Sequence, residues 1–321
     1  MRILVTGGAG FIGSHLCERL IKDGHTVTAI DNFSTGRASN LADLKNATNF
    51  TLVEGSILDT KILKPLIDAT EYVFHLAAAV GVFNIVNNPL ASLLTNIRGT
   101  ENVLEVAHET KTPVFLTSSS EVYGKNVSDS LKESDDRILG SPVTLRWSYS
   151  EAKAIDESLA YAYFIEKQLE TRIVRFFNTV GPRQLGAYGM VVPRFVKAAL
   201  ANEQISIYGD GNQTRCFAHV YDVVDAVIAI AFADNTLGKV INIGNDFEIS
   251  INGLAKKIIE ETGSTSEIAY VPYAEAYGDG FEDMERRVPN IDLINQLVGW
   301  KPKRDLSTMI GDISAEMKKG T

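Results

Sequence analysis

Short apolar runs alternate with stretches of helical spacing through the first half of the chain. The strand-like runs are residues 2–6, 26–30, 49–54, 72–77, 113–118 and 171–176. Helical spacing occupies residues 60–69, 89–110 and 149–168. The apolar runs are too short for helices, and the first is rich in branched residues, as buried strands are. This alternation predicts an α/β fold, a Rossmann-type doubly wound parallel sheet with helices on both faces.

From about residue 180 the alternation of strand-like and helical stretches becomes less regular, and Gly, Pro and aromatic residues interrupt shorter elements. Residues 240–244 predict a strand, and residues 251–263 predict an amphipathic helix. We expect residues 1–180 to form the Rossmann domain and residues 181–321 to form mainly a smaller α/β substrate-binding domain. The segment at about 219–245 is expected to return to the first domain as a packing helix and a strand.

Three glycines at three-residue intervals, Gly7, Gly10 and Gly13, join the first strand-like run to a helical stretch. In that context they permit a tight turn, close approach to a pyrophosphate and close helix packing. The following helix N-terminus favours phosphate binding. The next run ends at Asp31, whose carboxylate can accept both adenosine ribose hydroxyls and would repel a 2′-phosphate. A tight turn without a ligand explains an isolated glycine triplet equally well. Here the strand before the turn, the helix after it and the acid at the end of the next strand together predict bound NAD rather than NADP.

Tyr149 and Lys153 are four residues apart on a predicted helix and therefore share one face. A tyrosine titrates near 10. A neighbouring ammonium and a nicotinamide cation favour the phenolate, so we expect a lowered pKa and a general base. Ser119, Ser120 and Glu121 follow the run at 113–118, where a hydroxyl can bind a sugar alcohol and relay its proton. We expect one or two of the hydroxyls there to be structural.

Composition and charge limit the classes of molecule that we expect this protein to bind. The chain has 321 residues and a net charge of −9, which argues against nucleic acid or an anionic membrane as the partner. Its two cysteines, Cys17 and Cys216, are far apart and have no zinc-ligand spacing, so we expect no metal site. The N-terminus reads as a strand rather than a signal peptide, and no apolar run approaches about 18 residues. We expect a soluble cytoplasmic protein.

Several motifs in order resemble a known family. They are the glycine turn, Asp31, residues 75–78, residues 119–124, the Tyr149/Lys153 pair, residues 175–178, residues 209–215 and residues 297–302. Together they are similar to the extended short-chain dehydrogenases/reductases, and more narrowly to the NAD-dependent nucleotide-sugar epimerases, decarboxylases and dehydratases. The resemblance runs through the whole chain.

The resemblance implies a role for each matching residue. Tyr149 takes the proton from the sugar 4-hydroxyl, Lys153 holds the nicotinamide ribose, and Ser119 or Ser120 binds the 4-oxygen. Transfer of the C4 hydride to NAD gives a 4-keto sugar. The expected substrate-binding residues are Asn178 and Arg215 at the diphosphate, Tyr208 along the nucleobase, Val192, Arg194 and Arg287. The expected cofactor-binding residues, besides those above, are Phe11, Ile12, Asn32, Ser56, Ile57, Leu76, Ala77, Ala78 and Asn96.

The fate of the 4-keto sugar depends on residues near it. Glu121 resembles the acid of the decarboxylases and of some dehydratases, and Arg287 resembles the sugar-site arginine of UDP-glucuronate decarboxylases. Two features depart from that pattern: Ser119 replaces a threonine, and residues 139–148 lack the usual Asn-Pro-x-x-x-Arg sequence. A UDP-glucuronate decarboxylase is favoured. A UDP-sugar 4-epimerase acting on UDP-glucose or UDP-glucuronate stays open, and a 4,6-dehydratase or a non-catalytic NAD sensor is less favoured.

The expected partner is a nucleotide sugar, most simply a UDP-sugar. The helical stretches at 89–110 and 149–168 can form a dimer bundle, as in relatives, so we also expect a homodimer. Ordinary packing of both helices onto the sheet is the alternative.

Overall fold

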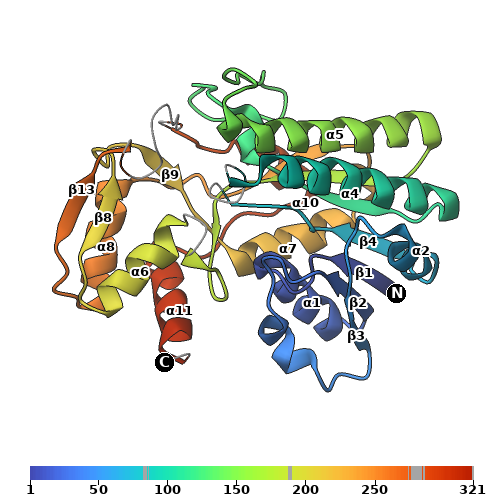
Figure 1. The fold of residues 1–321 in the computed structure, drawn as a ribbon, viewed down its shortest axis with the longest axis horizontal. Helices are drawn as coiled ribbons and strands as arrows, with labels where there is room; N and C mark the ends of the chain where they lie inside the picture. Colours follow the sequence, from blue (N-terminus) through green and yellow to red (C-terminus); the bar gives the residue numbers. More distant parts are fainter. Residues whose placement is uncertain are drawn as a thin grey trace.

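A computed structural model describes residues 1–81, 85, 87–186, 190–273, 275, 284 and 286–319. Figure 1 shows two lobes: a larger one around a twisted sheet, which contains the N-terminus, and a smaller one that contains the C-terminus. None of the helices described is long and apolar enough to cross a membrane.

The larger lobe is built on a seven-stranded parallel sheet. Its strands are β1 (Arg2–Thr6), β2 (Thr26–Asp31), β3 (Phe50–Glu54), β4 (Tyr72–His75), β5 (Val114–Ser119), β6 (Thr171–Phe176) and β11 (Val240–Ile243). Their order is β11-β6-β5-β4-β1-β2-β3, and each neighbouring pair is parallel. The chain reverses its direction of travel across the sheet between β1 and β4, which is where open α/β sheets bind ligands.

Helices cover both faces of this sheet, as Figure 1 shows. One face carries α1 (Phe11–Lys22), α7 (Val220–Ala231) and α10 (Asp292–Val298), which share one apolar core with the sheet. The other carries α2 (Thr60–Asp68), α4 (Pro89–Thr110) and α5 (Ser148–Lys167), which share a second. Leu16 in the first core and Leu104 in the second are fully buried. The predicted doubly wound fold is confirmed.

The smaller lobe has its own apolar core. Its helices are α6 (Val191–Leu200), α8 (Ile251–Thr262) and α11 (Leu306–Lys319). They pack around β8 (Ile205–Tyr208), which pairs in parallel with β13 (Ile268–Val271). Two further pairs, β7 (Thr179–Val180) with β10 (Ala218–His219) and β9 (Thr214–Cys216) with β12 (Glu248–Ser250), lie where the chain passes between lobes.

The predicted elements agree with the structure to within a residue or two. Short 3-10 helices add η1 (Ala38–Leu44), η2 (Ser120–Tyr123), η3 (Leu145–Trp147) and η5 (Asp234–Thr236). The largest difference is β4, which ends at His75 instead of residue 77. Leu76 and Ala77 instead donate their backbone N–H groups to the main-chain oxygen and the hydroxyl of Thr6, so they close against the end of β1.

Candidate active site

A cavity of about 490 Å³ runs from the glycine turn across the carboxyl ends of the strands into the smaller lobe. With one exception, every residue expected in the cofactor, catalytic or substrate site lines it. The exception is Asn96, which is buried on α4 and brackets Ala79, accepting from its N at 2.7 Å and donating to its O at 3.2 Å. Asn96 therefore supports the loop after β4 instead of lining the cavity.

The glycine turn is packed too tightly for side chains. A Cβ on Gly7, whose φ is +70°, would lie 2.8 Å from the backbone N of Ala77, and a Cβ on Gly13 would lie 2.2 Å from the Gly7 carbonyl oxygen. Helix α1 begins at Phe11, and among the described residues no side chain caps its N-terminus. The first-turn N–H groups thus face the cavity, and the turn fits a dinucleotide pyrophosphate.

Asp31 is fixed at the end of β2. Its carboxylate accepts from Ala9 N at 2.9 Å and from Phe33 N at 2.8 Å. Burial raises the pKa of this carboxyl, and the backbone hydrogen bonds oppose that rise. A carboxylate oriented in this way keeps lone pairs for ribose hydroxyls, which is the arrangement that NAD requires.

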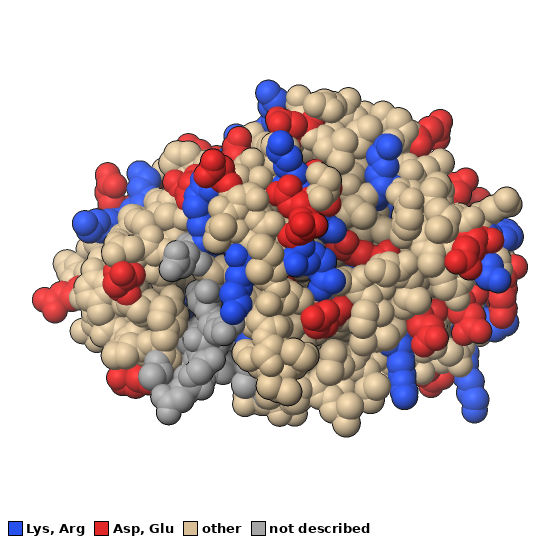
Figure 2. Space-filling model, turned by 90° about the horizontal axis from the view of Figure 1, so that it is seen from above, with Lys and Arg blue, Asp and Glu red and all other residues tan. Residues whose placement is uncertain are grey.

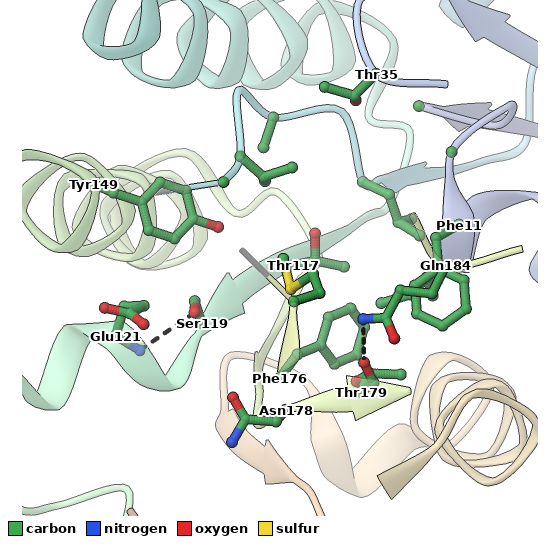
Figure 3. A pocket seen from close by; sticks show the side chains of 18 of the residues that line it. Phe11, Thr35, Thr117, Ser119, Glu121, Tyr149, Phe176, Asn178, Thr179 and Gln184 are labelled. Atoms are coloured by element: carbon green, nitrogen blue, oxygen red, sulfur yellow. Dashed lines mark hydrogen bonds between the residues drawn. The ribbon is translucent and has the colours of Figure 1, made fainter. Parts of the chain in front are cut away.

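Tyr149 and Lys153 lie on α5 beside the end of β5. Figure 3 shows the Tyr149 ring over the cavity with Ser119 and Glu121 nearby. Lys153 Nζ donates to the Thr117 carbonyl oxygen at 3.0 Å and to Asp156 Oδ2 at 3.1 Å. The sequence did not single out Asp156, although its place three residues after Lys153 on the same helix was a usable signal.

The pKa of Tyr149 is raised in the protein alone, contrary to the direction predicted from the sequence. Burial is the largest cause, the charges of Glu121 and Asp156 add to it, and a hydrogen bond with Ser119 opposes it. The sequence argument counted the Lys153 ammonium but not the two carboxylates.

The three serines at the end of β5 and the start of η2 have different partners. Ser118 donates to Glu157 Oε1 at 2.5 Å, and Ser120 accepts from Arg287 Nη1 at 3.2 Å. Ser119 accepts from Glu121 N at 3.2 Å and adjoins Tyr149. Ser119 is thus the serine whose hydroxyl lies beside Tyr149 in the cavity.

Glu121 is held between two arginines. Its carboxylate lies 2.6 Å from Arg146 Nη1 and 2.9 Å from Arg287 Nη1, and both arginine side chains are buried. Burial raises the pKa of Glu121, but the two guanidinium charges outweigh it and hold the pKa far below its usual range. Glu121 is therefore ionised, and two cations face one anion beside Tyr149.

Arg146 is a site residue that the sequence analysis missed. It lies on η3, and its loop was set apart because Ser141 stands where an asparagine was expected. The signal was nevertheless present, since Pro142 is followed four residues later by an arginine just before α5.

The far end of the cavity lies in the smaller lobe. The Arg194 guanidinium stacks 4.0 Å above the Tyr208 ring, with Val192 two residues earlier on α6. Arg215 lies on β9 and donates to the Thr214 carbonyl oxygen at 2.8 Å. Asn178, at the end of β6, donates to the Cys216 carbonyl oxygen at 3.3 Å. Tyr208 thus already has a planar partner, and a nucleobase would share that stack.

Fold and site together define a dinucleotide-dependent enzyme of the short-chain dehydrogenase/reductase class. Residues 4–313 match the family described as GDP-mannose 4,6 dehydratase. The chain belongs to that family, whose members act on nucleotide sugars, and its cofactor is NAD. The family that the sequence motifs indicated is confirmed.

Relatives of known activity cover nearly the whole chain. UDP-N-acetyl-alpha-D-glucosaminuronate decarboxylase from Bacillus cytotoxicus is 41% identical over 94% of this chain and 92% of its own length. UDP-glucuronic acid decarboxylase 1 from Xenopus tropicalis is 37% identical over 94% of this chain and 68% of its own. UDP-glucuronic acid 4-epimerase from Bacillus cereus, solved with UDP-glucuronic acid and NAD, is 28% identical with a TM-score of 0.90, covering 100% of both chains.

Proposed function

We propose that this chain decarboxylates a UDP-linked uronic acid by transient oxidation at C4. The observation that carries the proposal is Glu121 held between buried Arg146 and Arg287 beside Tyr149. Both guanidinium groups line the cavity, and among the described residues Arg287 Nε has no hydrogen-bond partner. A guanidinium suits a carboxylate, because its N–H fork matches the two oxygens. The carboxylate of a uronic acid can bind in this way, whereas a neutral hexose brings no such group.

The chain's own residues divide the reaction between them. Tyr149 takes the proton of the sugar 4-hydroxyl, and Ser119 donates a hydrogen bond to the same oxygen. Lys153 holds the nicotinamide ribose. When bound, NAD supplies the acceptor for the C4 hydride and later returns it. When C4 is a ketone, the carboxylate on C5 is β to that ketone and can leave as carbon dioxide. Ser119 and protonated Tyr149 stabilise the negative charge that then develops on the C4 oxygen. C5 then takes a proton from solvent, and Tyr149 returns its own proton to the 4-oxygen when C4 is reduced again.

The first proposed substrate is UDP-glucuronate. UDP-N-acetylglucosaminuronate is a specific second candidate, because the Bacillus cytotoxicus relative named for that substrate is 41% identical to this chain. Both have the carboxylate that the arginines require. A 4-epimerase remains the alternative reaction, since the Bacillus cereus neighbour has the same fold.

Product analysis separates these alternatives. The protein is incubated separately with UDP-glucuronate, UDP-N-acetylglucosaminuronate, UDP-glucose and UDP-N-acetylglucosamine, and the products are read by proton NMR. A UDP-pentose, or its acetamido form, from a uronate supports the proposal. A UDP-galacto-configured product without loss of carbon dioxide would replace it with the epimerase reading.

We also propose that the two lobes divide the ligands. Residues 1–180, with the segment at about 219–245, hold NAD, while residues 181–321 hold mainly the nucleotide part of the substrate. In support, Gly7 and Asp31 lie at one end of the cavity, and Arg194, Tyr208 and Arg215 lie at the other. The diphosphate would meet Arg215 and Asn178, since a guanidinium fork matches phosphate oxygens.

A homodimer through α4 and α5 is proposed as the assembly. Large apolar side chains are exposed there: Leu90 at 68%, Ile155 at 42%, Tyr161 at 49% and Ile165 at 56%. Tyr161 and Ile165 are four residues apart and share one face of α5. Light scattering on a size-exclusion column should give twice the chain mass, and Ile165→Glu should halve it. The two buried free thiols, Cys17 and Cys216, support a reducing compartment such as the cytoplasm.

A further inference from the structure

Asp156 on α5 is a fully buried carboxylate to which the steps above assign no part. It lies one turn after Lys153, and the side chains of Asp156 and Lys153 are 0% and 3% exposed. The Lys153 ammonium has three N–H donors. One goes to the Thr117 carbonyl oxygen at 3.0 Å and one to Asp156 Oδ2 at 3.1 Å. Because Lys153 lines the cavity, its third donor is left for a ligand.

We propose that Asp156 is a positioning residue for the reaction, which fixes the Lys153 ammonium so that its third N–H meets the nicotinamide ribose. The inference rests on the proposed roles of Tyr149 and Lys153. It does not depend on what happens to the sugar after C4 is oxidised. Decarboxylation, epimerisation and dehydration all begin with that step, so Asp156 can be tested with whichever substrate turns over.

A chain of buried polar groups supports Asp156 from behind. Thr100 on α4 interacts with its carboxylate, and the Thr100 hydroxyl lies 3.1 Å from His75 Nε2. His75 Nδ1 lies 2.8 Å from the Thr6 hydroxyl, which accepts from Ala77 N at 3.1 Å. The hydrogen-bonded groups behind Asp156 thus reach from α4 to the strand ends beside the glycine turn.

His75 links Thr6 to Thr100 as a neutral ring. Burial and the charge of Lys153 lower the pKa of His75 to about 3. A neutral imidazole donates from one ring nitrogen and accepts at the other, so His75 can join the two hydroxyls in either tautomer. Asp156 Oδ1 has no hydrogen-bond partner among the described residues, so Lys153 provides the hydrogen bond that holds this carboxylate.

Asp156 has a second, opposite effect on the site. Its negative charge raises the pKa of Tyr149 and works against the proposed base. The other charged or titratable groups around Tyr149 and Lys153 are Glu121 on η2, Arg146 on η3, Arg287, His75 on β4 and Glu157 on α5. Removing only the charge of Asp156 should thus loosen Lys153 and at the same time ease ionisation of Tyr149. Simple loss of packing would not produce this pair of effects.

The test compares Asp156→Asn, which keeps shape and removes charge, with Glu151→Gln as a matched control. Glu151 is on the same helix, is 44% exposed and pairs with Arg137. Asp156→Asn should weaken NAD binding and lower kcat by about tenfold each, with the KM of the UDP-sugar nearly unchanged. The acid limb of its kcat–pH profile should move to lower pH by about half a unit. The control should match the wild type in all four quantities.

Two further measurements keep the test decisive. NAD titration of the sugar-free protein measures the effect of the Lys153 contact on affinity even if no substrate turns over. A failure of the Asp156 proposal can therefore be told apart from a failure of the proposed function. In a Lys153→Met background, Asp156→Asn should weaken NAD by less than about twofold, because the contact it supports is gone. Equal loss in both backgrounds, or wild-type NAD affinity in Asp156→Asn, would overturn the proposal. If Asp156→Asn does not fold, Thr100→Val provides the same comparison through the group behind Asp156.

Discussion

The two ends of the cavity are built from different materials. The cofactor end consists of backbone and one fixed carboxylate: the turn at Gly7, the uncapped start of α1, and Asp31 held by two backbone N–H groups. The sugar end consists of charged side chains from three distant segments, with Glu121 between Arg146 and Arg287. We expect the cofactor end to bind a dinucleotide whatever the reaction, and the sugar end to select the sugar and the reaction.

The largest expected effect lies where the two ends meet. Tyr149→Phe removes one hydroxyl and the proposed base, so turnover should fall by about a hundredfold or more. NAD binding should stay close to that of the wild type, because the glycine turn and Asp31 are untouched. Steady-state rates and NAD titration check both statements. Near-normal turnover would remove Tyr149 from the mechanism.

A somewhat smaller effect is expected at the sugar end. Arg287→Ala removes the guanidinium that we propose binds the sugar carboxylate, so kcat/KM for a UDP-uronate should fall by about a hundredfold. NAD affinity should not change. The informative comparison is the change in KM for a uronate against the change in Ki for the matching UDP-hexose as a competitive inhibitor. Equal losses for both would show that Arg287 does not seat the carboxylate.

At the nucleotide, Arg215→Ala should raise the KM of the UDP-sugar by about tenfold and leave kcat within a factor of about two. The reason is that a charge-assisted diphosphate contact is lost from the ground state and the transition state alike. Initial rates over a range of substrate concentrations provide the check. A fall in kcat at constant KM would mean that Arg215 acts on the chemistry instead.

The smallest effect is expected at the cofactor end. Asp31→Ser should weaken NAD by about tenfold or less and bring the affinities for NAD and NADP closer together, because the carboxylate that repels a 2′-phosphate is gone. Titration with both dinucleotides measures the ratio. If the wild type prefers NADP, the interpretation of Asp31 is wrong.

The same contrast explains what the sequence could predict. The strands, the helix at 89–110 and the glycine turn follow from local periodicity and backbone geometry, and all were found within one or two residues of their predicted bounds. Arg146 was missed because its role depends on Glu121, 25 residues away, and on Arg287 at the other end of the chain. Asn96 was placed in the cavity, yet it turns to the backbone of Ala79, a rotamer that sequence spacing does not determine.

The pKa of Tyr149 illustrates the same limit. The Lys153 neighbour was visible as an i, i+4 pair, but the burial of the phenol and its proximity to Glu121 arise only when η2 packs against α5. The choice among Ser118, Ser119 and Ser120 likewise required the partners of each hydroxyl, which are Glu157, the Glu121 backbone and Arg287.

The most direct test of the central claim follows the carboxyl carbon itself. UDP-glucuronate labelled isotopically at that carbon is incubated with the protein, and the label is traced in the gas phase and in the UDP-sugar. The proposed decarboxylation predicts that the label leaves as carbon dioxide in step with formation of an unlabelled UDP-pentose, with no net consumption of NAD. Full retention of the label in a UDP-uronate of inverted C4 configuration would contradict it and establish the epimerase instead.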